Sequence, residues 1–416
     1  MIERYKIKEI EEIWSEENKL KLWLKIEILT IEGFEKNGIL PKGISDRIKK
    51  KNIIITPLEV KEREKITNHD VAAFVDVLEK KVGEDIAPFV HFGLTSSDLI
   101  DTTIAIQMRD TLKIVLNRLK ILEKILENKI RENKGILIAG RTHGMFAEPM
   151  TLTHKFLSYL SEAKRNEKRL KEIIKEVSFG KISGSVGNYL HVPPEVEFYV
   201  LKKLNLKPEP VSTQIVPRDR HVLFLFGLVL IGNFLERLAT EIRLLSRTEV
   251  RELSEPFSEG QKGSSSMPHK KNPVISERIC GLARLLRGYL ISILENTNLW
   301  HERDISHSST ERIVLPDASH LIVYMLEKMI YILENLIINK EKIKENFKKY
   351  EKELFSQEFL YFLLKKGKKR SEAYEHVQKK IFEGKIPVDE EDFEKLKEEV
   401  YNKLIEIEKK MINRLL

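Results

Sequence analysis

Hydrophobic and polar positions in the first 95 residues form short helical segments separated by glycine, asparagine or proline. One segment places four apolar residues on a single helix face: Val71, Phe74, Val75 and Leu78. Asn68 is the expected N-cap of this helix, and Ser15 is the expected N-cap of an earlier one. A further helix is expected to restart at Ser45. The pattern predicts a small helical domain over residues 1–95.

From Ser97 the pattern changes, because more than 35 residues of mixed apolar and charged character follow without a glycine or proline. At 1.5 Å per residue such a helix would be roughly 50 Å long. Comparable runs follow at about 149–178, 217–249, 272–299 and 315–339. Five long helices with short connectors predict an elongated bundle as the central domain, 96–339. The highly charged part after it, 340–416, is predicted to be a third helical domain in which Ser371 caps a helix.

The most apolar run in the chain is VLFLFGLVLIG at 222–232. Its 11 residues are fewer than the roughly 20 that a membrane-spanning helix needs. A sequence that is apolar around the whole circumference instead predicts a helix buried on all sides, inside a bundle or an oligomer.

Composition and charge exclude few classes of function. The 416 residues, 42% of them hydrophobic, suffice for two or three domains with their own cores. The formal net charge of +8 comes from basic residues mixed with acidic ones along the helices, which favours salt-bridged faces over a nucleic-acid stripe and also suits an anionic substrate. Cys280 is the single cysteine and cannot form an internal disulfide. Since the N-terminus also lacks a secretory pattern, the expected location is the cytoplasm.

The connectors hold the unusual chemistry, above all GSSSMPHKKNP at 263–273. A simple turn needs one or two small residues and gains nothing from Lys270 and Lys271. A serine hydroxyl becomes a base only where cationic or backbone N–H neighbours favour its deprotonated form. This loop supplies both kinds of neighbour within a few residues.

Three other connectors carry candidate polar groups. In GRTHGMFAEP, His143 precedes a helix that Pro149 is expected to start. In TNHD, His69 lies next to Asp70, which suits a first helical turn or can orient a histidine. A lone histidine or arginine is more often structural. The arginines and serines of HERDISHSSTER, at short spacing near a helix start, are nevertheless a pattern that can hold a phosphate or carboxylate.

Two standard motifs are excluded. HERDISH lacks the second histidine of the zinc motif H-E-x-x-H, because that position is Ile305. Gly180, Gly184 and Gly187 do not have G-x-G-x-x-G spacing, and no strand is expected before them. We therefore expect neither a metal nor a dinucleotide cofactor.

The loop at 263–273 resembles the signature G-S-S-x-M-P-x-K-x-N-P of the fumarase/aspartase superfamily. Within it, flanking stretches from residue 2 to about 380 are similar to the adenylosuccinate lyase family. They include IERY, NHDVAAFV, HFGLTSSDLIDT, GRTHGMFAEP, KISGSVGN, STQIVPRDRH, RTEVRELSEPF, WHERDISHSSTERIVLPD and SEAYEHVQ. The resemblance thus covers almost the whole chain.

The resemblance implies a β-elimination without metal or organic cofactor. Adenylosuccinate would give AMP and fumarate, and succinyl-aminoimidazole carboxamide ribotide (SAICAR) would give AICAR, in purine nucleotide biosynthesis. A base removes a proton from the carbon β to the departing nitrogen, charge spreads into a carboxylate, and an acid protonates the leaving amine. By the family pattern Ser264 is the base and His143 the acid, although which serine of 264–266 ionises stays open.

The same resemblance implies roles for the remaining site residues. Glu277 would pair with His143 and set its proton, and His69 would assist binding and orientation. Lys270 and Asn272 would hold the succinyl carboxylates. Further substrate contacts are implied for Asp70, Thr95, Ser96, Thr142 and Gln214, and nucleotide and phosphate contacts for Arg4, Tyr5, Arg303, Ser308 and Arg312.

The implied fold is three all-α domains whose central bundle associates fourfold into a twenty-helix core, with each active site shared by three subunits. The alternatives are another lyase of the superfamily, such as argininosuccinate lyase or the carboxymuconate cycloisomerase, which would lack the phosphate-binding set. A catalytically inactive helical scaffold or nucleic-acid binder is the alternative from a different class.

Overall fold

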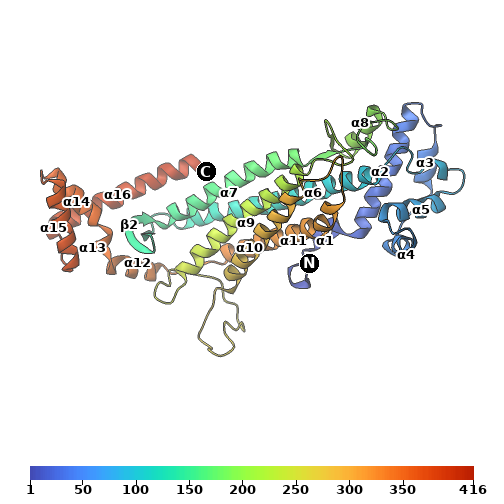
Figure 1. Ribbon diagram of the computed structural model, residues 1–416. Coiled ribbons are helices and arrows are strands. Elements are labelled where there is room, and N and C mark those ends of the chain that lie inside the picture. The colour runs from blue at the N-terminus through green and yellow to red at the C-terminus, as the bar shows by residue number, and fades with distance from the viewer. The chain divides into compact units, whose positions relative to one another are not determined.

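The computed structural model describes residues 1–416 and confirms the all-α prediction, with sixteen α-helices and only short two-stranded sheets (Figure 1). The chain forms two compact units, each assembled from three segments. Unit 1 comprises 1–118, 166–233 and 282–326, and unit 2 comprises 119–165, 234–281 and 327–416. The domain boundaries expected at 95/96 and 339/340 stay predictions.

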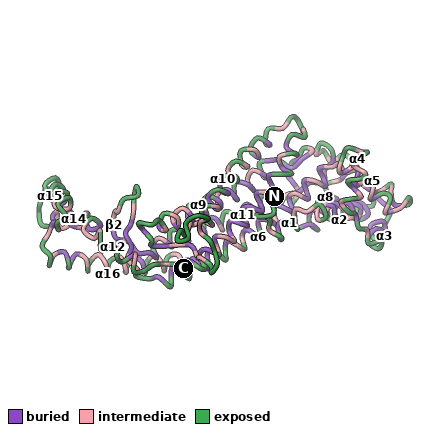
Figure 2. The backbone as a smooth tube through the Cα atoms, turned by 90° about the horizontal axis from the view of Figure 1, so that it is seen from below, coloured by how far each residue is buried: buried purple, intermediate pink, exposed green.

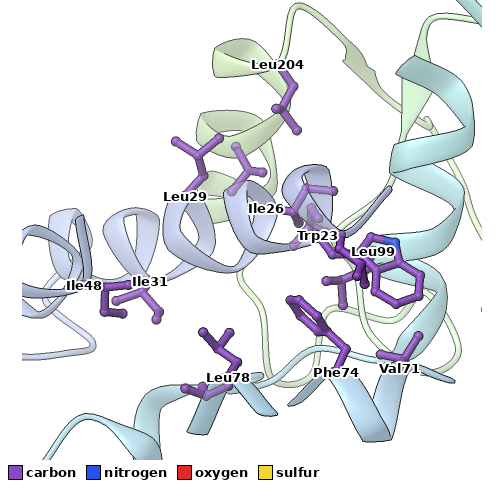
Figure 3. Close-up of a cluster of buried hydrophobic side chains, with 14 of the residues drawn as sticks. Trp23, Ile26, Leu29, Ile31, Ile48, Val71, Phe74, Leu78, Leu99 and Leu204 are labelled. Carbon is purple, nitrogen blue, oxygen red and sulfur yellow. The ribbon is translucent and has the colours of Figure 1, made fainter. Parts of the chain in front are cut away.

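The N-terminal part of unit 1 is a cluster of short helices: α1 (Lys8–Trp14), α2 (Glu16–Lys36), α3 (Ile44–Lys50), α4 (Pro57–Thr67), α5 (Asp70–Val82) and, later in the chain, α8 (Pro194–Lys203). Two 3₁₀ turns, Glu3–Tyr5 and Ala87–Phe89, flank it in sequence. Trp23 and Phe74 point toward each other in the core and meet edge to face at 5.4 Å (Figure 3). Val71, Phe74 and Leu78 are buried as predicted, and Val75 is half-buried.

The helix caps agree with the sequence only in part. Ser15 caps α2 as predicted, accepting a hydrogen bond from the Asn18 N–H at 3.1 Å. Asn68 does not cap α5. It ends α4 in a left-handed conformation, and the His69 ring caps α5 instead. The prediction for Ser45 was also wrong, since α3 begins one residue earlier, where Gly43 at φ 92° makes a turn that glycine adopts without strain.

The five predicted long helices are all present: α6 (Ser96–Glu132), α7 (Leu152–Glu176), α9 (Asp219–Leu245), α10 (Val274–Glu295) and α11 (Ser306–Glu334). The fifth begins nine residues earlier than 315, because Pro316 lies inside the helix instead of near its start. The segment before this proline is held by side-chain bonds, among them Asn296 Nδ2 to Thr310 Oγ1 at 2.7 Å. Tertiary contacts therefore offset the loss of one backbone hydrogen bond at Pro316.

The apolar run at 222–232 lies within α9, which is 27 residues long. By length and composition this helix could cross a membrane, with a mean hydropathy of 1.9 over its most apolar stretch, but 61% of that stretch is buried inside the structure. Core helices of larger proteins have the same composition. Burial, more than length, thus supports the predicted core role, although Phe226 remains 44% exposed.

Two of the connectors contain strands that the sequence analysis missed. β1 (Leu137–Thr142) and β2 (Met145–Thr151) form an antiparallel hairpin, and β3 (Phe179–Gly180) pairs in parallel with β4 (Lys207–Pro208). Pro149 therefore does not start a helix. It pairs with Ala139 beside a register shift in the two-stranded ribbon, where a residue without an N–H is tolerated. The glycines after Phe179 do follow a strand, though one of two residues only.

The C-terminal part of unit 2 contains α12 (Lys340–Lys349), α13 (Glu351–Leu354), α14 (Ser356–Lys365), α15 (Arg370–Phe382) and α16 (Glu390–Leu415). Phe355, Phe359 and Phe393 form its core. Ser371 does not cap α15, since the helix begins at Arg370 without a side-chain cap. β5 (Leu253–Ser254) and β6 (Ile337–Ile338) pair antiparallel between α9 and α12 in the chain.

Candidate active site

The predicted site residues divide between the two units. Unit 1 carries Arg4, Tyr5, His69, Asp70, Thr95, Ser96, Gln214, Arg303, Ser308 and Arg312. Unit 2 carries Thr142, His143, Ser264, Lys270, Asn272 and Glu277. Most of the groups with an implied binding role thus lie in one unit, and the implied acid and base lie in the other.

His143 lies at the tip of the β1–β2 hairpin. Thr142 pairs with Met145, so His143 and Gly144 form a two-residue turn, and their φ angles of 56° and 78° are those of a type I′ turn. A histidine in this left-handed region is unusual, and such strain is often found at functional sites. The turn exposes the imidazole, which has no hydrogen-bond partner within the chain, and Thr142 beside it is also exposed.

Ser264 lies in the long loop between β5 and α10, which is mostly exposed (Figure 2). Its Oγ accepts hydrogen bonds from the backbone N–H groups of Ser266 at 3.3 Å and Met267 at 3.1 Å. Backbone donors of this kind favour the deprotonated form of the acceptor and so lower the cost of forming an alkoxide. The local turn therefore gives Ser264 surroundings that suit a base.

The two ends of the loop segment 263–272 lie close together next to Ser264. A Cβ on Gly263 would lie 2.0 Å from the Lys270 carbonyl oxygen, so only glycine allows this approach of the two backbones. Asn272 Nδ2 donates to the Gly263 carbonyl at 2.9 Å. Asn272 thus has a structural contact within the loop in addition to its implied role toward a carboxylate.

Lys270 and Glu277 flank the end of the loop, with Glu277 in the first turn of α10. Both are exposed, and neither side chain has a partner within the chain. The structure therefore does not bring the Glu277 carboxylate to the His143 ring in a single chain. The pairing implied for them stays a prediction.

In unit 1, His69 and Asp70 form one connected group with two other predicted residues. His69 Nδ1 accepts from the Ala72 N–H at 3.3 Å and lies 3.6 Å from Asp70 Oδ1, while its Nε2 lies 3.4 Å from Ser96 Oγ. Asp70 Oδ2 accepts from Arg312 at 2.9 Å. An Nδ1 that accepts the helix N–H leaves Nε2 as the protonated nitrogen of a neutral ring. Nε2–H is then the donor that this histidine can offer.

Thr95 and Ser96 are held at the start of α6 by a buried carboxylate that the sequence analysis did not single out. Asp98 Oδ2 accepts from the Thr95 N–H at 2.8 Å. Its Oδ1 pairs with Lys181 and accepts from the Ser183 N–H at 3.1 Å. Both charged side chains are fully buried, so this pair fixes the KISGSVGN connector against the helix.

Arg303 connects with Gln214 and, through His307, with a buried ion cluster. Its Nη1 donates to Gln214 Oε1 at 2.9 Å, and its Nε lies 3.4 Å from His307 Nε2. His307 Nδ1 lies 3.2 Å from Glu311, which also binds Arg218 at 2.9 Å. Arg218 Nη2 also lies 3.3 Å from His307 Nδ1, so this ring contacts two arginines and one carboxylate. The arginine implied to hold phosphate is thus oriented by Gln214 and His307.

The remaining predicted residues lie at the chain start and on α11. Tyr5 packs edge to face on Tyr324 at 5.1 Å, and the Met1 amino group pairs with Asp317 at 3.0 Å. These contacts fix the 3₁₀ turn that holds Arg4, whose side chain is exposed without a partner. Ser308 is half-buried, and its hydroxyl also has no partner within the chain.

His91 begins the HFGLTSSD connector and was not among the predicted site residues. It adopts a φ of 53°, its N–H donates to Glu27 at 2.9 Å and its Nδ1 lies 2.7 Å from the second oxygen of that buried carboxylate. Burial alone would lower the pKa of His91, but the hydrogen bond and charge of Glu27 outweigh burial and raise it. A left-handed non-glycine residue with a buried counter-charge is a signal that only the structure supplies.

Cavities of about 310 to 780 Å³ lie in the C-terminal part of unit 2 and beside α8. The cavities at these two places are not lined by any predicted site residue. The predicted residues instead lie on exposed turns, loops and helix ends.

Comparison with known proteins identifies the family. Residues 5–288 match the model of a family described as Lyase. The chain is 48% identical to an adenylosuccinate lyase of Thermotoga maritima over 91% of this chain and 88% of that protein. It is 41% identical to that of Bacillus subtilis over 100% and 94% of the two chains.

A solved structure supports the fold. The fumarate lyase from Mesorhizobium sp. BNC1 matches with a TM-score of 0.85 and 22% identity, covering 100% of this chain and 99% of that one. The identity and coverage of the sequence relatives, over nine-tenths of the chain or more, are what decide the family. The chain belongs to the adenylosuccinate lyase family of the fumarase/aspartase superfamily.

Proposed function

We propose that this chain cleaves adenylosuccinate to AMP and fumarate, and SAICAR to AICAR and fumarate, in purine nucleotide biosynthesis. The observation that carries the proposal is the identity of 41–48% to adenylosuccinate lyases along nearly the whole chain. The signature loop and the His143 hairpin supply groups of the types that this elimination requires.

Ser264 is the proposed base. Its alkoxide takes the proton from the carbon β to the departing nitrogen, and the electron pair spreads into the adjacent carboxylate. The two backbone N–H groups that point at Oγ support this role, because they stabilise negative charge before the proton is taken. Lys270 and Asn272, which follow Ser264 in the same loop, are proposed to hold the succinyl carboxylates.

His143 is the proposed acid. When the electron pair returns and breaks the C–N bond, the imidazolium protonates the leaving amine, which yields AMP and fumarate. The exposed hairpin tip suits this step, since the ring can reach a substrate held by other elements. Glu277 is proposed to pair with His143 from a neighbouring subunit and to set its proton.

The phosphate and nucleotide are proposed to bind at Arg4, Tyr5, Arg303, Ser308 and Arg312, with Asp70, Thr95, Ser96, Thr142 and Gln214 as further contacts. His69 is proposed to assist orientation through Nε2. Arg303 supports this assignment, since His307 and Gln214 already fix the direction of its guanidinium group. A preoriented arginine loses less entropy when it binds an anion.

We further propose a cytoplasmic homotetramer in which three subunits form each active site. Exposed apolar and small residues on α10, namely Leu285, Gly288 and Ile291, support an association through this helix. They follow the i, i+3 spacing of one helix face. His143, Lys270 and Glu277 are also exposed, so each side chain is accessible to residues of a neighbouring subunit.

The test is to incubate the purified protein with adenylosuccinate and to quantify AMP and fumarate, beside Ser264→Ala and His143→Asn. Asparagine is the better replacement at 143, because it tolerates the left-handed turn. We expect equal amounts of the two products from the wild type and losses of about 10²–10⁴-fold in kcat for each variant. A wild type without product would refute the proposal, and argininosuccinate would then be tested as substrate.

A further inference from the structure

Two buried carboxylates lie on the short segment Glu252–Glu255, here called the ELSE segment, in the stretch RTEVRELSEPF. Glu252 is fully buried and Glu255 is 9% exposed. Neither residue belongs to the set of proposed substrate contacts. Each side chain binds a different element that carries a residue of the proposed chemistry.

Glu252 anchors the hairpin that carries His143. Its two oxygens accept from Arg141 Nη1 at 3.0 Å and Nη2 at 2.6 Å, and the same guanidinium donates to the Ala139 carbonyl at 3.1 Å. Arg141 also lies over the Phe146 ring at 5.0 Å. Arg141 is two residues before His143, so this bidentate contact fixes the base of the turn at its first strand.

Glu255 anchors the other catalytic element, at the point where the signature loop enters α10. Its oxygens accept from the N–H groups of Ile275 at 3.1 Å and Ser276 at 2.5 Å. These are free donors of the first helical turn, where a carboxylate is also favoured by the helix dipole. Glu277 and Asn272 lie within a few residues of this contact.

The segment between the two carboxylates is itself fixed. Leu253 and Ser254 form β5 and pair with β6. The Glu252 N–H donates to the Leu245 carbonyl at 2.9 Å, and its carbonyl accepts from the Asn339 N–H at 3.0 Å. Asn346 binds Glu252 Oε1 at 2.9 Å from α12. Glu252 and β5 are thus held by the end of α9 and by the segment around α12, and Glu255 follows directly after β5.

We propose that Glu252 and Glu255 are positioning residues, which set the place of the acid hairpin and of the end of the base-bearing loop from one rigid segment. The inference rests on the proposed function, since it assigns His143 and the loop to catalysis. A displacement of about 1 Å in a reacting group can cost roughly 10²-fold in rate. Loss of either carboxylate should therefore lower kcat while the binding groups of unit 1 stay unchanged.

The test uses Glu252→Gln and Glu255→Gln in the full-length protein, with kinetics and hydrogen exchange measured on each. We expect kcat to fall by about 10–10²-fold in both variants. KM should change by less than about threefold in Glu252→Gln and should also rise in Glu255→Gln, because the proposed carboxylate-binding residue Asn272 lies beside that anchor. Amide exchange should rise in 137–151 for Glu252→Gln, and at the first turn of α10 for Glu255→Gln. If Glu252→Gln fails to fold, Arg141→Lys keeps the charge without the two-point contact and should show the same exchange pattern.

Glu241→Gln is the matched control, because Glu241 pairs with Lys155 at 2.6 Å in unit 2 without touching the hairpin or the loop. It should keep the wild-type kcat. Wild-type kcat in both test variants would overturn the inference, and so would exchange that rises throughout unit 2 together with the loss of kcat. An inactive wild type would refute the proposed function alone, since the local exchange pattern would still test the two anchors.

Discussion

Ser264 is the one serine of the three consecutive serines whose hydroxyl accepts backbone hydrogen bonds. The hydroxyls of Ser265 and Ser266 have no partner within the chain, and both residues are exposed. The sequence alone leaves the three equivalent in chemistry. Their different surroundings follow from a turn that brings two N–H groups to a single oxygen.

Ser264→Ala and Ser265→Ala should therefore differ strongly. We expect the first to lose about 10²–10⁴-fold in kcat, because the proposed base is removed. The second should stay within about tenfold of the wild type, because it keeps the proposed base and the two N–H groups that bind its hydroxyl. Single-turnover rates and the Kd for adenylosuccinate measure the effect, and Ser264→Ala should still bind substrate. Equal and mild losses in both variants would remove serine from the mechanism.

At the scale of elements, a buried ion cluster joins α6, α9 and α11 within unit 1. Arg218, just before α9, donates to Asp101 at 2.6 Å and to Glu311 at 2.9 Å, and His221 lies 3.0 Å from Glu311. Burial alone would raise the pKa of Asp101, but the charge and hydrogen bonds of Arg218 outweigh burial and lower it. For Glu311 the charges of His221 and Arg218 likewise outweigh burial and hold its pKa well below the usual range.

Asp101→Asn should reveal this cluster as a pH-dependent difference in stability. A carboxyl whose pKa is lowered by folding stabilises the protein above its unfolded pKa, and this contribution is lost as the pH falls through the folded pKa. At pH 7 the variant should be less stable by about 3 kcal/mol. The difference in free energy of unfolding should shrink below about pH 4, where the unfolded carboxyl begins to protonate. Urea unfolding followed by circular dichroism measures it, and a constant difference between pH 3 and 7 would contradict the argument.

The long helices could be predicted from the sequence, because uninterrupted runs without glycine or proline leave few alternatives. Helix starts were less predictable, since Asn68 and His69 are adjacent and both can accept a hydrogen bond from a helix N–H. The ion cluster was not predictable, because Arg218 meets partners 117 and 93 residues away in the chain. Its members look like ordinary surface charges until the fold brings them together.

The candidate site likewise has features that could be predicted from the sequence and features that could not. Short motifs in the sequence carry the family resemblance from which its proposed residues come, and their roles stay predictions. The type I′ turn around His143 could not be predicted, because a GRTHG stretch reads as a loop before Pro149 and not as a hairpin. The anchors Glu252 and Glu255 also look like unremarkable acidic residues, since their partners lie in other connectors.

At the scale of the whole molecule, the proposed tetramer depends on the exposed face of α10. Leu285 is 48% exposed and Ile291 is 64% exposed, while Gly288 has open space around it. Apolar residues beside a glycine allow a second helix to pack closely. A single chain leaves this surface in water, which costs stability that association would restore.

Leu285→Glu should therefore dissociate the assembly and remove activity with it. By symmetry the substitution places a charge at every copy of the interface, and burying an unpaired carboxylate costs several kcal/mol. Size-exclusion chromatography with light scattering gives the mass, beside the lyase assay at the same concentrations. Ile54→Glu is the control, since Ile54 is equally apolar and 73% exposed but lies before α4. A Leu285→Glu protein that remains a fully active tetramer would contradict this arrangement.

The contact between Gly263 and Lys270 makes residues 263–272 a closed ring, which Asn272 fastens from inside. The arm 256–262 connects this ring to β5, so a movement of the arm would carry the backbones of Ser264 and Lys270 together. The serine hydroxyl and the lysine ammonium would then reach a substrate together and leave it together. A half-closed loop would have neither group at the substrate. Proton removal by the proposed base would then occur only when the substrate carboxylate is also bound.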